Sequence, residues 1–137
     1  MCALFMGVIA FAQFNESDVF QDGDGNSSTV TQSGSYNLSD VDQIGDDNTS
    51  VVTQAGVSNE SVVLQQGDDN TSAVSQDGID NYSRVRQYTF TLGTADNNDS
   101  SVNQTGDDNY SDVWQDGDNH VSTVDQDGDD NYAFLDQ

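Results

Sequence analysis

The chain has 137 residues, of which 25 are acidic and 2 are basic, so its formal net charge is −23, and only 33% of the residues are hydrophobic. This composition argues against a large apolar enzyme core and is typical of disordered acidic chains, because so little apolar burial does not offset chain entropy. Arg84 and Arg86 are the only basic side chains, so neither nucleic-acid binding nor membrane insertion is expected. A single Cys and a single His leave no set for a zinc site, a disulfide or a catalytic triad. We therefore expect neither an enzyme nor a resident cofactor.

Residues 1–12 have the pattern of a cleaved signal peptide. An apolar run from Leu4 to Phe11 leads into Ala10-Phe11-Ala12, which has the small residues that a signal peptidase requires. Cleavage there would start the mature chain at Gln13 and predicts export, with a buried N-terminal strand as the alternative. The run is too short to cross a membrane.

An eleven-residue repeat fills the rest of the chain, residues 13–137. Its clearest marker is glutamine, which recurs at positions 21, 32, 43, 54, 65, 76 and 87, and then at 104, 115, 126 and 137. The step is seventeen between Gln87 and Gln104, so six residues are inserted there, in a loop at about 88–95. The unit is Asn-x-Ser-x-Val-x-Gln-x-Gly-x-x, and His120 replaces one Asn as a substitute hydrogen-bond donor.

The constant positions of this unit lie two residues apart, which is the periodicity of a β-strand with one face held constant. Gly followed by residues such as Asp46 and Asp47 predicts a turn, so each unit is one strand and one turn. Residues after the Asn alternate with a period of 22, which indicates that two strands make one coil. We expect an all-β fold: a short cross-β solenoid with two strands per coil, about five and a half coils and a height of some 25 Å.

The thin interior of such a coil would hold one Val per strand, flanked by Ser, Asn and Gln. Apolar burial on this scale falls short of the entropy of ordering the chain. Identical amides on successive coils can hydrogen-bond along the stack, and we expect these ladders to specify the fold. The expected ladder residues are Asn26, Gln32, Asn37, Gln43, Asn48, Gln54, Asn59, Gln65, Asn70, Gln76, Asn81, Gln87, Asn98, Gln104, Asn109, Gln115, Gln126, Asn131 and Gln137. Both ends of the stack should expose strand edges that another copy could continue.

The Gly-Asp-Asp-Asn turns are candidates for calcium binding, because carboxylate and carbonyl oxygens suit this cation. The candidate ligands are Asp46, Asp47, Asp68 and Asp69. The period of eleven differs from the nine residues of calcium-binding β-rolls. Diffuse screening of stacked carboxylates, or charge-based control of premature aggregation, is therefore the alternative.

Two outward features also have competing interpretations. Residues 27–31 and 49–53 would form a flat, hydroxyl-rich face like that of ice-binding solenoids, or would simply reflect β-propensity on a solvated face. Tyr82, Tyr110 and Tyr132 are expected to form a cross-coil ladder of stacked rings, with a platform for a ligand as the alternative.

The repeat resembles that of the curlin family, the subunits of bacterial curli fibres, in which Gln-x-Gly-x-x-Asn-x-Ala-x3-Gln recurs about every 22 residues. Gln43-x-Gly45-x-x-Asn48-x-Ser50-x3-Gln54 fits with Ser in place of Ala, and similar spans begin at Gln21, Gln65 and Gln126. Ser39 lies nearer to Gln43 than the family's Ser lies to its Gln. The match extends over nearly the whole mature chain.

This resemblance implies export through an outer-membrane secretion pore, self-assembly outside the cell into cross-β fibres, started by a nucleating curlin, and a role in adhesion and biofilm matrix. Our leading hypothesis is a structural subunit of a cell-surface functional amyloid. A monomeric acidic β-solenoid with a calcium-dependent adhesive or ice-binding role is the first alternative. A disordered acidic chain is the second.

Overall fold

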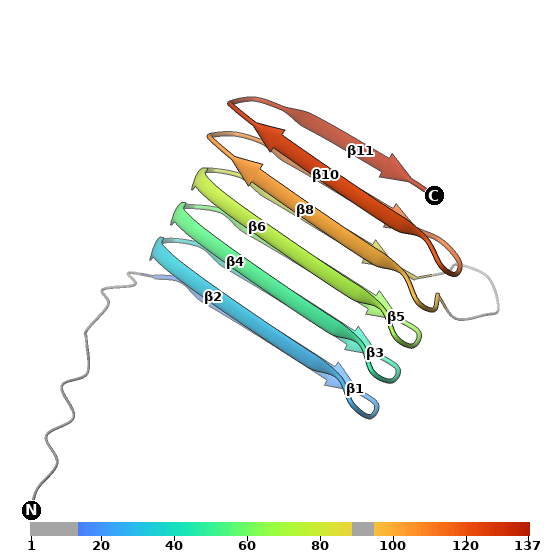
Figure 1. Ribbon diagram of the computed structural model, residues 1–137. Helices are drawn as coiled ribbons and strands as arrows, with labels where there is room; N and C mark the ends of the chain where they lie inside the picture. The colour runs from blue at the N-terminus through green and yellow to red at the C-terminus, as the bar shows by residue number, and fades with distance from the viewer. Residues whose placement is uncertain (1–13, 89–94) are drawn as a thin grey trace, which may run out of the picture.

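The computed structural model of the protein describes residues 14–88 and 95–137, and within them strands are the only regular secondary structure (Figure 1). Eleven strands form two sheets, which confirms the all-β solenoid predicted from the repeat. The predicted signal peptide, 1–12, lies outside the described residues, as do residues 89–94 of the predicted inserted loop. No helix long and apolar enough to span a membrane occurs in the described part of the chain.

Odd-numbered and even-numbered strands belong to different sheets. One sheet contains, in order, β1 (Glu16–Asp22), β3 (Leu38–Ile44), β5 (Glu60–Gln66), β7 (Tyr82–Gln87), β9 (Tyr110–Gln115) and β11 (Tyr132–Asp136). The other contains β10 (Val121–Asp127), β8 (Asp99–Thr105), β6 (Thr71–Ile79), β4 (Thr49–Val57) and β2 (Ser27–Ser35). Because consecutive strands alternate between the sheets, two strands make one coil, and about five coils stack from the blue end to the red end of Figure 1.

Neighbouring strands are parallel and place each residue beside its counterpart in the next coil, two units along the chain. The offset is 22 residues, as in the pairing of Val41 with Val63. Across the insertion it becomes 28, as in the pairing of Val85 with Val113, so the six extra residues leave the register intact. Ala95 takes the turn position that Gly holds elsewhere, and its carbonyl accepts a hydrogen bond from Asn70 Nδ2 at 2.6 Å.

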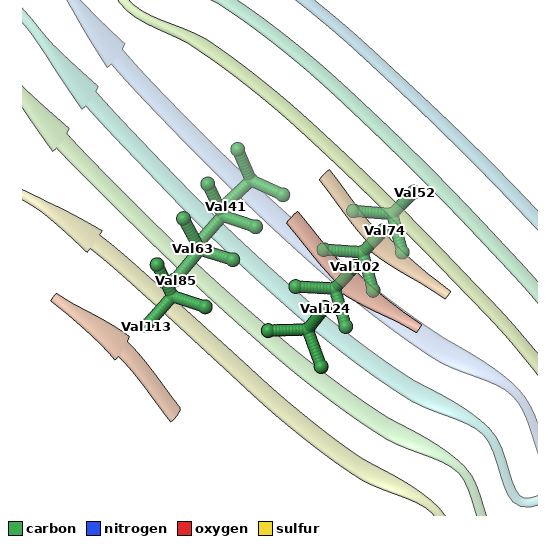
Figure 2. Close-up of a cluster of buried hydrophobic side chains, with 8 residues drawn as sticks. All are labelled: Val41, Val52, Val63, Val74, Val85, Val102, Val113 and Val124. Carbon is green, nitrogen blue, oxygen red and sulfur yellow. The ribbon is translucent and has the colours of Figure 1, made fainter. Parts of the chain in front are cut away.

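The core is a narrow double column of valines between the two sheets (Figure 2). Its buried members are Val41, Val52, Val63, Val74, Val85, Val102, Val113 and Val124. The Ser, Asn and Gln positions of the central units are buried beside them, which confirms the predicted inward face. Polar side chains thus fill most of the interior, and their hydrogen bonds join one coil to the next.

The turns need glycine for two separate reasons. Gly56 has a φ of +112°, a conformation that other residues rarely adopt. A Cβ atom at Gly56 would also lie 2.0 Å from the carbonyl oxygen of Gly78 in the next coil. The turns of successive coils therefore pack backbone against backbone, which keeps the coils in line.

Candidate functional site: side-chain ladders and open edges

The glutamines form two hydrogen-bonded columns, one along each sheet. Gln43 Nε2 donates to Gln65 Oε1 at 2.8 Å, and Gln65 Nε2 donates to Gln87 Oε1 at 2.9 Å. Gln65 Nε2 also donates across the core to the Thr49 carbonyl oxygen at 3.0 Å. The columns comprise Gln21, Gln43, Gln65, Gln87, Gln115 and Gln137 in one sheet, and Gln32, Gln54, Gln76, Gln104 and Gln126 in the other. Each amide therefore joins its coil to the next coil and its sheet to the facing sheet.

The asparagines form equivalent columns where each turn meets its strand. Asn37 Oδ1 accepts a hydrogen bond from the Asn59 backbone N–H at 3.1 Å, and Asn59 Nδ2 donates to the Gly78 carbonyl oxygen at 3.0 Å. The predicted members in these columns are Asn26, Asn37, Asn48, Asn59, Asn70, Asn81, Asn98, Asn109 and Asn131. The Asn side chain thus fixes the following strand and the following turn together.

His120 occupies one position of an Asn column and replaces Asn only in part. Its backbone N–H donates to Asn98 Oδ1 at 2.9 Å, so the column continues through the main chain. Its ring Nε2 lies 3.2 Å from the Asp116 carbonyl oxygen in its own turn, where it donates when it carries the proton. The imidazole therefore stabilises its own coil.

The turn aspartates, which were expected to stack, form a further column through hydrogen bonds to the backbone that the sequence did not reveal. Asp46 Oδ1 accepts from the Asp24 N–H at 2.8 Å, and Asp68 Oδ1 accepts from the Asp46 N–H at 2.9 Å. Asp47 and Asp69, the other two calcium candidates, have left-handed φ angles of 56° and 58°. Among residues 14–88 and 95–137, no three His, Cys, Asp or Glu side chains converge to hold one metal ion. Calcium binding at these turns stays a prediction.

The inward serines are buried, but their hydroxyl groups have no hydrogen-bond partner within the described residues. They are Ser28, Ser39, Ser50, Ser61, Ser72, Ser83, Ser100, Ser111 and Ser122. Burying a hydroxyl without a partner costs roughly 1–3 kcal/mol. This position therefore contributes a small volume to the core and no bond, in keeping with the Ala that fills it in the last unit.

The two cations of the chain meet one carboxylate on the outer face of the six-stranded sheet. Arg84 on β7 forms an ion pair with Asp112 on β9, and Arg86 Nη2 lies 3.0 Å from Asp112 Oδ1. The Arg86 guanidinium also lies 4.9 Å from the centroid of the Trp114 ring, on which Tyr88 stacks at 5.9 Å. We call this group the Arg–Asp112 cluster. It joins β7 to β9, which are neighbours in the sheet although the insertion and β8 lie between them in the chain.

The outer face of this sheet has different electrostatic surroundings over different strands. Burial alone would raise the pKa of the Asp112 carboxyl, but the hydrogen bonds and charges of Arg84 and Arg86 outweigh it and hold that pKa below its ordinary value. On β3, partial burial and the charges of Asp42 and Asp18 raise the pKa of Asp40. The outer face therefore carries carboxylates over β1 and β3 and the cationic cluster over β7 and β9.

Stacked tyrosines lie along the same face. The rings of Tyr82 and Tyr110 are 5.1 Å apart and those of Tyr110 and Tyr132 are 4.9 Å apart, which confirms the predicted aromatic ladder. Stacking of this kind follows directly from the in-register pairing of β7, β9 and β11.

Both ends of the stack are open in the described part of the chain. There, β1 and β2 at one end, and β10 and β11 at the other, have a strand neighbour on one side only. A hollow of about 620 Å³ at the C-terminal end is lined by residues that include Val124, Gln126 and Leu135. It opens onto the interior of the coil, beside the last members of the Val and Gln columns.

The repeat has a counterpart among known protein families. The model of the curlin associated repeat matches residues 15–45, 45–78 and 106–137, which together make up more than half of the chain. The segment between the second and third matches contains β7, the insertion and β8. Neither the curated proteins nor the solved structures include a match to the chain.

Proposed function

Because the chain belongs to the family of curlin-repeat proteins, we propose that it is a structural subunit of an extracellular, curli-like functional amyloid in which copies add end to end. Curlin-repeat proteins are structural subunits and not enzymes. The observation that carries the proposal is the unbroken in-register stacking of the inward Val and Gln residues from one end of the coil stack to the other.

The open ends supply complementary groups for the addition of a second copy. Gln Nε2 groups donate toward the C-terminal end, so Gln126 offers a donor there and Gln32 offers an acceptor at the N-terminal end. A copy that stacks head to tail would continue each Gln column and cover Val124 and Leu135, which line the hollow at the C-terminal end. Edge strands template further strands by the same main-chain hydrogen bonds that join the coils.

We further propose that the chain is exported and polymerises outside the cell, in adhesion and biofilm matrix. The signal-peptide pattern of residues 1–12 and the family membership support export through an outer-membrane pore. A nucleating curlin would start the fibre. The charge of −23 would keep dilute chains apart before nucleation.

The test is seeded conversion of the purified soluble chain. Fibre growth would be followed by thioflavin T fluorescence, with and without sonicated fibres, and the product examined by fibre diffraction. We expect seeds to abolish the lag, and reflections at about 4.8 Å and about 10 Å. A chain that stays monomeric at high concentration would instead support a calcium-dependent or ice-binding monomer. A chain without a sheet signal in circular dichroism would contradict the fold.

An edge variant tests the direction of growth. The Gln137 N–H donates to the Trp114 carbonyl oxygen on β9, and the Gln137 carbonyl accepts from the N–H of Asp116, just after β9. Alternate residues of a strand bond to opposite neighbours, so the Phe134 N–H, three residues earlier, points to the free edge. Phe134→Pro removes this donor and leaves the pairing with β9 intact. We expect it to slow elongation severely, whereas Phe134→Ala should elongate at nearly the normal rate. Equal rates for the two variants would contradict growth at β11.

A further inference from the structure

The outer face of the five-stranded sheet presents rows of short side chains on β2, β4 and β6. Thr29, Val51 and Ala73 form one row, and Thr31, Thr53 and Ser75 form the next. All six are exposed, although β4 and β6 have a strand on each side. We call this surface the uncharged face.

The uncharged face is exceptional in a chain with 25 acidic residues. The strands β2, β4 and β6 have nine residues each and together contain one acidic residue, Asp77. By contrast, the seven residues of β1 include Glu16, Asp18 and Asp22. Like charges within a Debye length of about 8 Å repel, so most surfaces of two copies resist close approach. Two uncharged faces can approach each other without this repulsion.

Its shape also suits contact with another sheet. The opposite sheet carries large outward side chains, among them Arg86 and Trp114, which lie against one another and make that face uneven. On the uncharged face, no side chain of the two rows is longer than Val or Thr. Two sheets with such rows can interdigitate at about 10 Å or less, as in steric zippers.

We propose that the uncharged face is a lateral interface, through which a second copy of the chain, carried in a neighbouring fibre, packs with its own uncharged face. The inference rests on the proposed function, because it concerns how fibres of stacked copies associate. Contact of a surface with itself is the isologous arrangement, in which one two-fold axis relates the partners. Since each copy has one such face, association through it yields pairs of filaments.

The size of the face indicates when pairing occurs. Nine residues at about 3.3 Å and three strands at about 4.8 Å give roughly 450 Å² per copy, or roughly 900 Å² for two. Stable complexes bury at least about 1,200 Å². Two free chains therefore fall short of a stable dimer, whereas in a fibre the face recurs in every copy and the contact area accumulates.

The test places carboxylates on the face without touching the core. V51E combined with T53E charges the centre of the uncharged face, and V62E combined with L64E places the same charges at the equivalent unit positions of β5, on the opposite sheet. Fibres of the full chain would be compared by scanning transmission electron microscopy, which measures mass per length. Circular dichroism and seeded growth would verify that each variant folds and elongates.

We expect the wild type and the V62E/L64E control to form paired filaments, and the V51E/T53E variant to form single filaments with half the mass per length. Raising the salt concentration to 0.5 M should restore pairing of that variant, because it screens the added charges. Paired V51E/T53E filaments at low salt, or unpaired wild-type filaments, would overturn the inference while leaving fibre formation intact. A wild type that forms no fibres at all would overturn both. If V51E/T53E filaments still pair but the variant loses an ice-binding activity of the wild type, the uncharged face binds ice and is not the lateral interface.

Discussion

Val52 on β4 and Val74 on β6 are paired residues of neighbouring strands, 22 positions apart in the chain, and their exposed fractions are 0% and 2% (Figure 2). Val74 pairs in turn with Val102, across the insertion. Each side chain in the column therefore packs on a copy of itself above and below. This relationship explains how a chain with so few apolar residues folds: a small core is repeated, and polar ladders join the repeats.

A charge introduced within the Gln ladder should lower the free energy of unfolding strongly, whereas the same charge next to the ladder should hardly change it. Gln65→Glu removes two donated hydrogen bonds and sets a buried carboxylate against Gln87 Oε1 and the Thr49 carbonyl oxygen. We expect a loss of more than about 3 kcal/mol in the free energy of unfolding, measured by denaturant titration. Gln66→Glu adds the same charge at an exposed position and should change stability by less than about 0.5 kcal/mol. Similar losses of stability for both variants would mean that the added charge, and not the broken ladder, causes the destabilisation.

Two turn glycines with nearly the same φ separate backbone conformation from crowding. Gly117 has a φ of +110°, and a Cβ there would meet only the His120 ring, at 3.5 Å. We expect Gly117→Ala to cost about 1–3 kcal/mol from its backbone conformation alone. Gly56→Ala should cost distinctly more, because its Cβ would collide with the Gly78 carbonyl. Thermal unfolding of the two variants gives the comparison, and equal losses would contradict the backbone contact between turns.

The Arg–Asp112 cluster should contribute stability at neutral pH and lose it in acid. The pKa of Asp112 is lower in the folded chain, so its contribution is complete above its ordinary pKa of about 3.9 and disappears as the pH falls through the folded value. Asp112→Asn leaves Arg84 and Arg86 without their anion. We expect a loss of roughly 2 kcal/mol at pH 7, less than for a fully enclosed pair because the Arg84 side chain is 34% exposed.

The control for Asp112→Asn is Asp99→Asn, at an exposed position of β8. It should change stability by less than about 0.5 kcal/mol. Denaturant midpoints at pH 7 and pH 3 should show the Asp112 effect shrinking in acid. An effect of Asp112→Asn that is as large at pH 3 as at pH 7 would indicate a packing role without the ion pair.

The carboxylate of Asp40, unlike that of Asp112, should lower the stability of the chain at neutral pH. Its pKa is raised in the folded chain, so its charge opposes folding at neutral pH, and stability is gained as the pH falls through the raised value. Asp40→Asn should therefore stabilise the chain at pH 7, by less than about 1 kcal/mol because the group is exposed to solvent. The gain should vanish below about pH 4. Urea unfolding across this range measures it, and a destabilised variant at pH 7 would refute the repulsion among Asp40, Asp42 and Asp18.

The sequence predicts most of this fold because the neighbours of each inward residue are copies of that residue. The two-residue spacing of the constant positions predicts the strand, the Gly and the residues after it predict the turn, and the 22-residue period predicts the alternation of sheets. The same spacing predicts that the insertion after Gln87 leaves the register intact, as the pairing of Val85 with Val113 shows.

Features that do not repeat could not be predicted in this way. The Arg–Asp112 cluster forms only because the register places its residues on adjacent strands. In the sequence, the one indication of this contact is that Arg84 and Asp112, like Arg86 and Trp114, hold the same position in units 28 residues apart. The partner of a turn carboxylate is also invisible in sequence, since the residue type predicts the turn but not the backbone N–H that Asp46 accepts from the preceding coil.

The most direct test of the central claim, that like residues of successive coils lie side by side, is spin labelling of one outward pair. Nitroxide labels would replace Leu38 and Glu60, which are paired on β3 and β5 and lie on the outer face of the six-stranded sheet, away from the uncharged face, in a chain whose Cys2 is replaced by Ser. Electron paramagnetic resonance of the doubly labelled chain should show strong dipolar broadening, since the labelled strands are about 4.8 Å apart. Fibres labelled at position 38 alone should show little, because equivalent sites in stacked copies lie some 25 Å apart. Sharp spectra from the double label, or strong coupling from the single label in fibres, would contradict the coil stack.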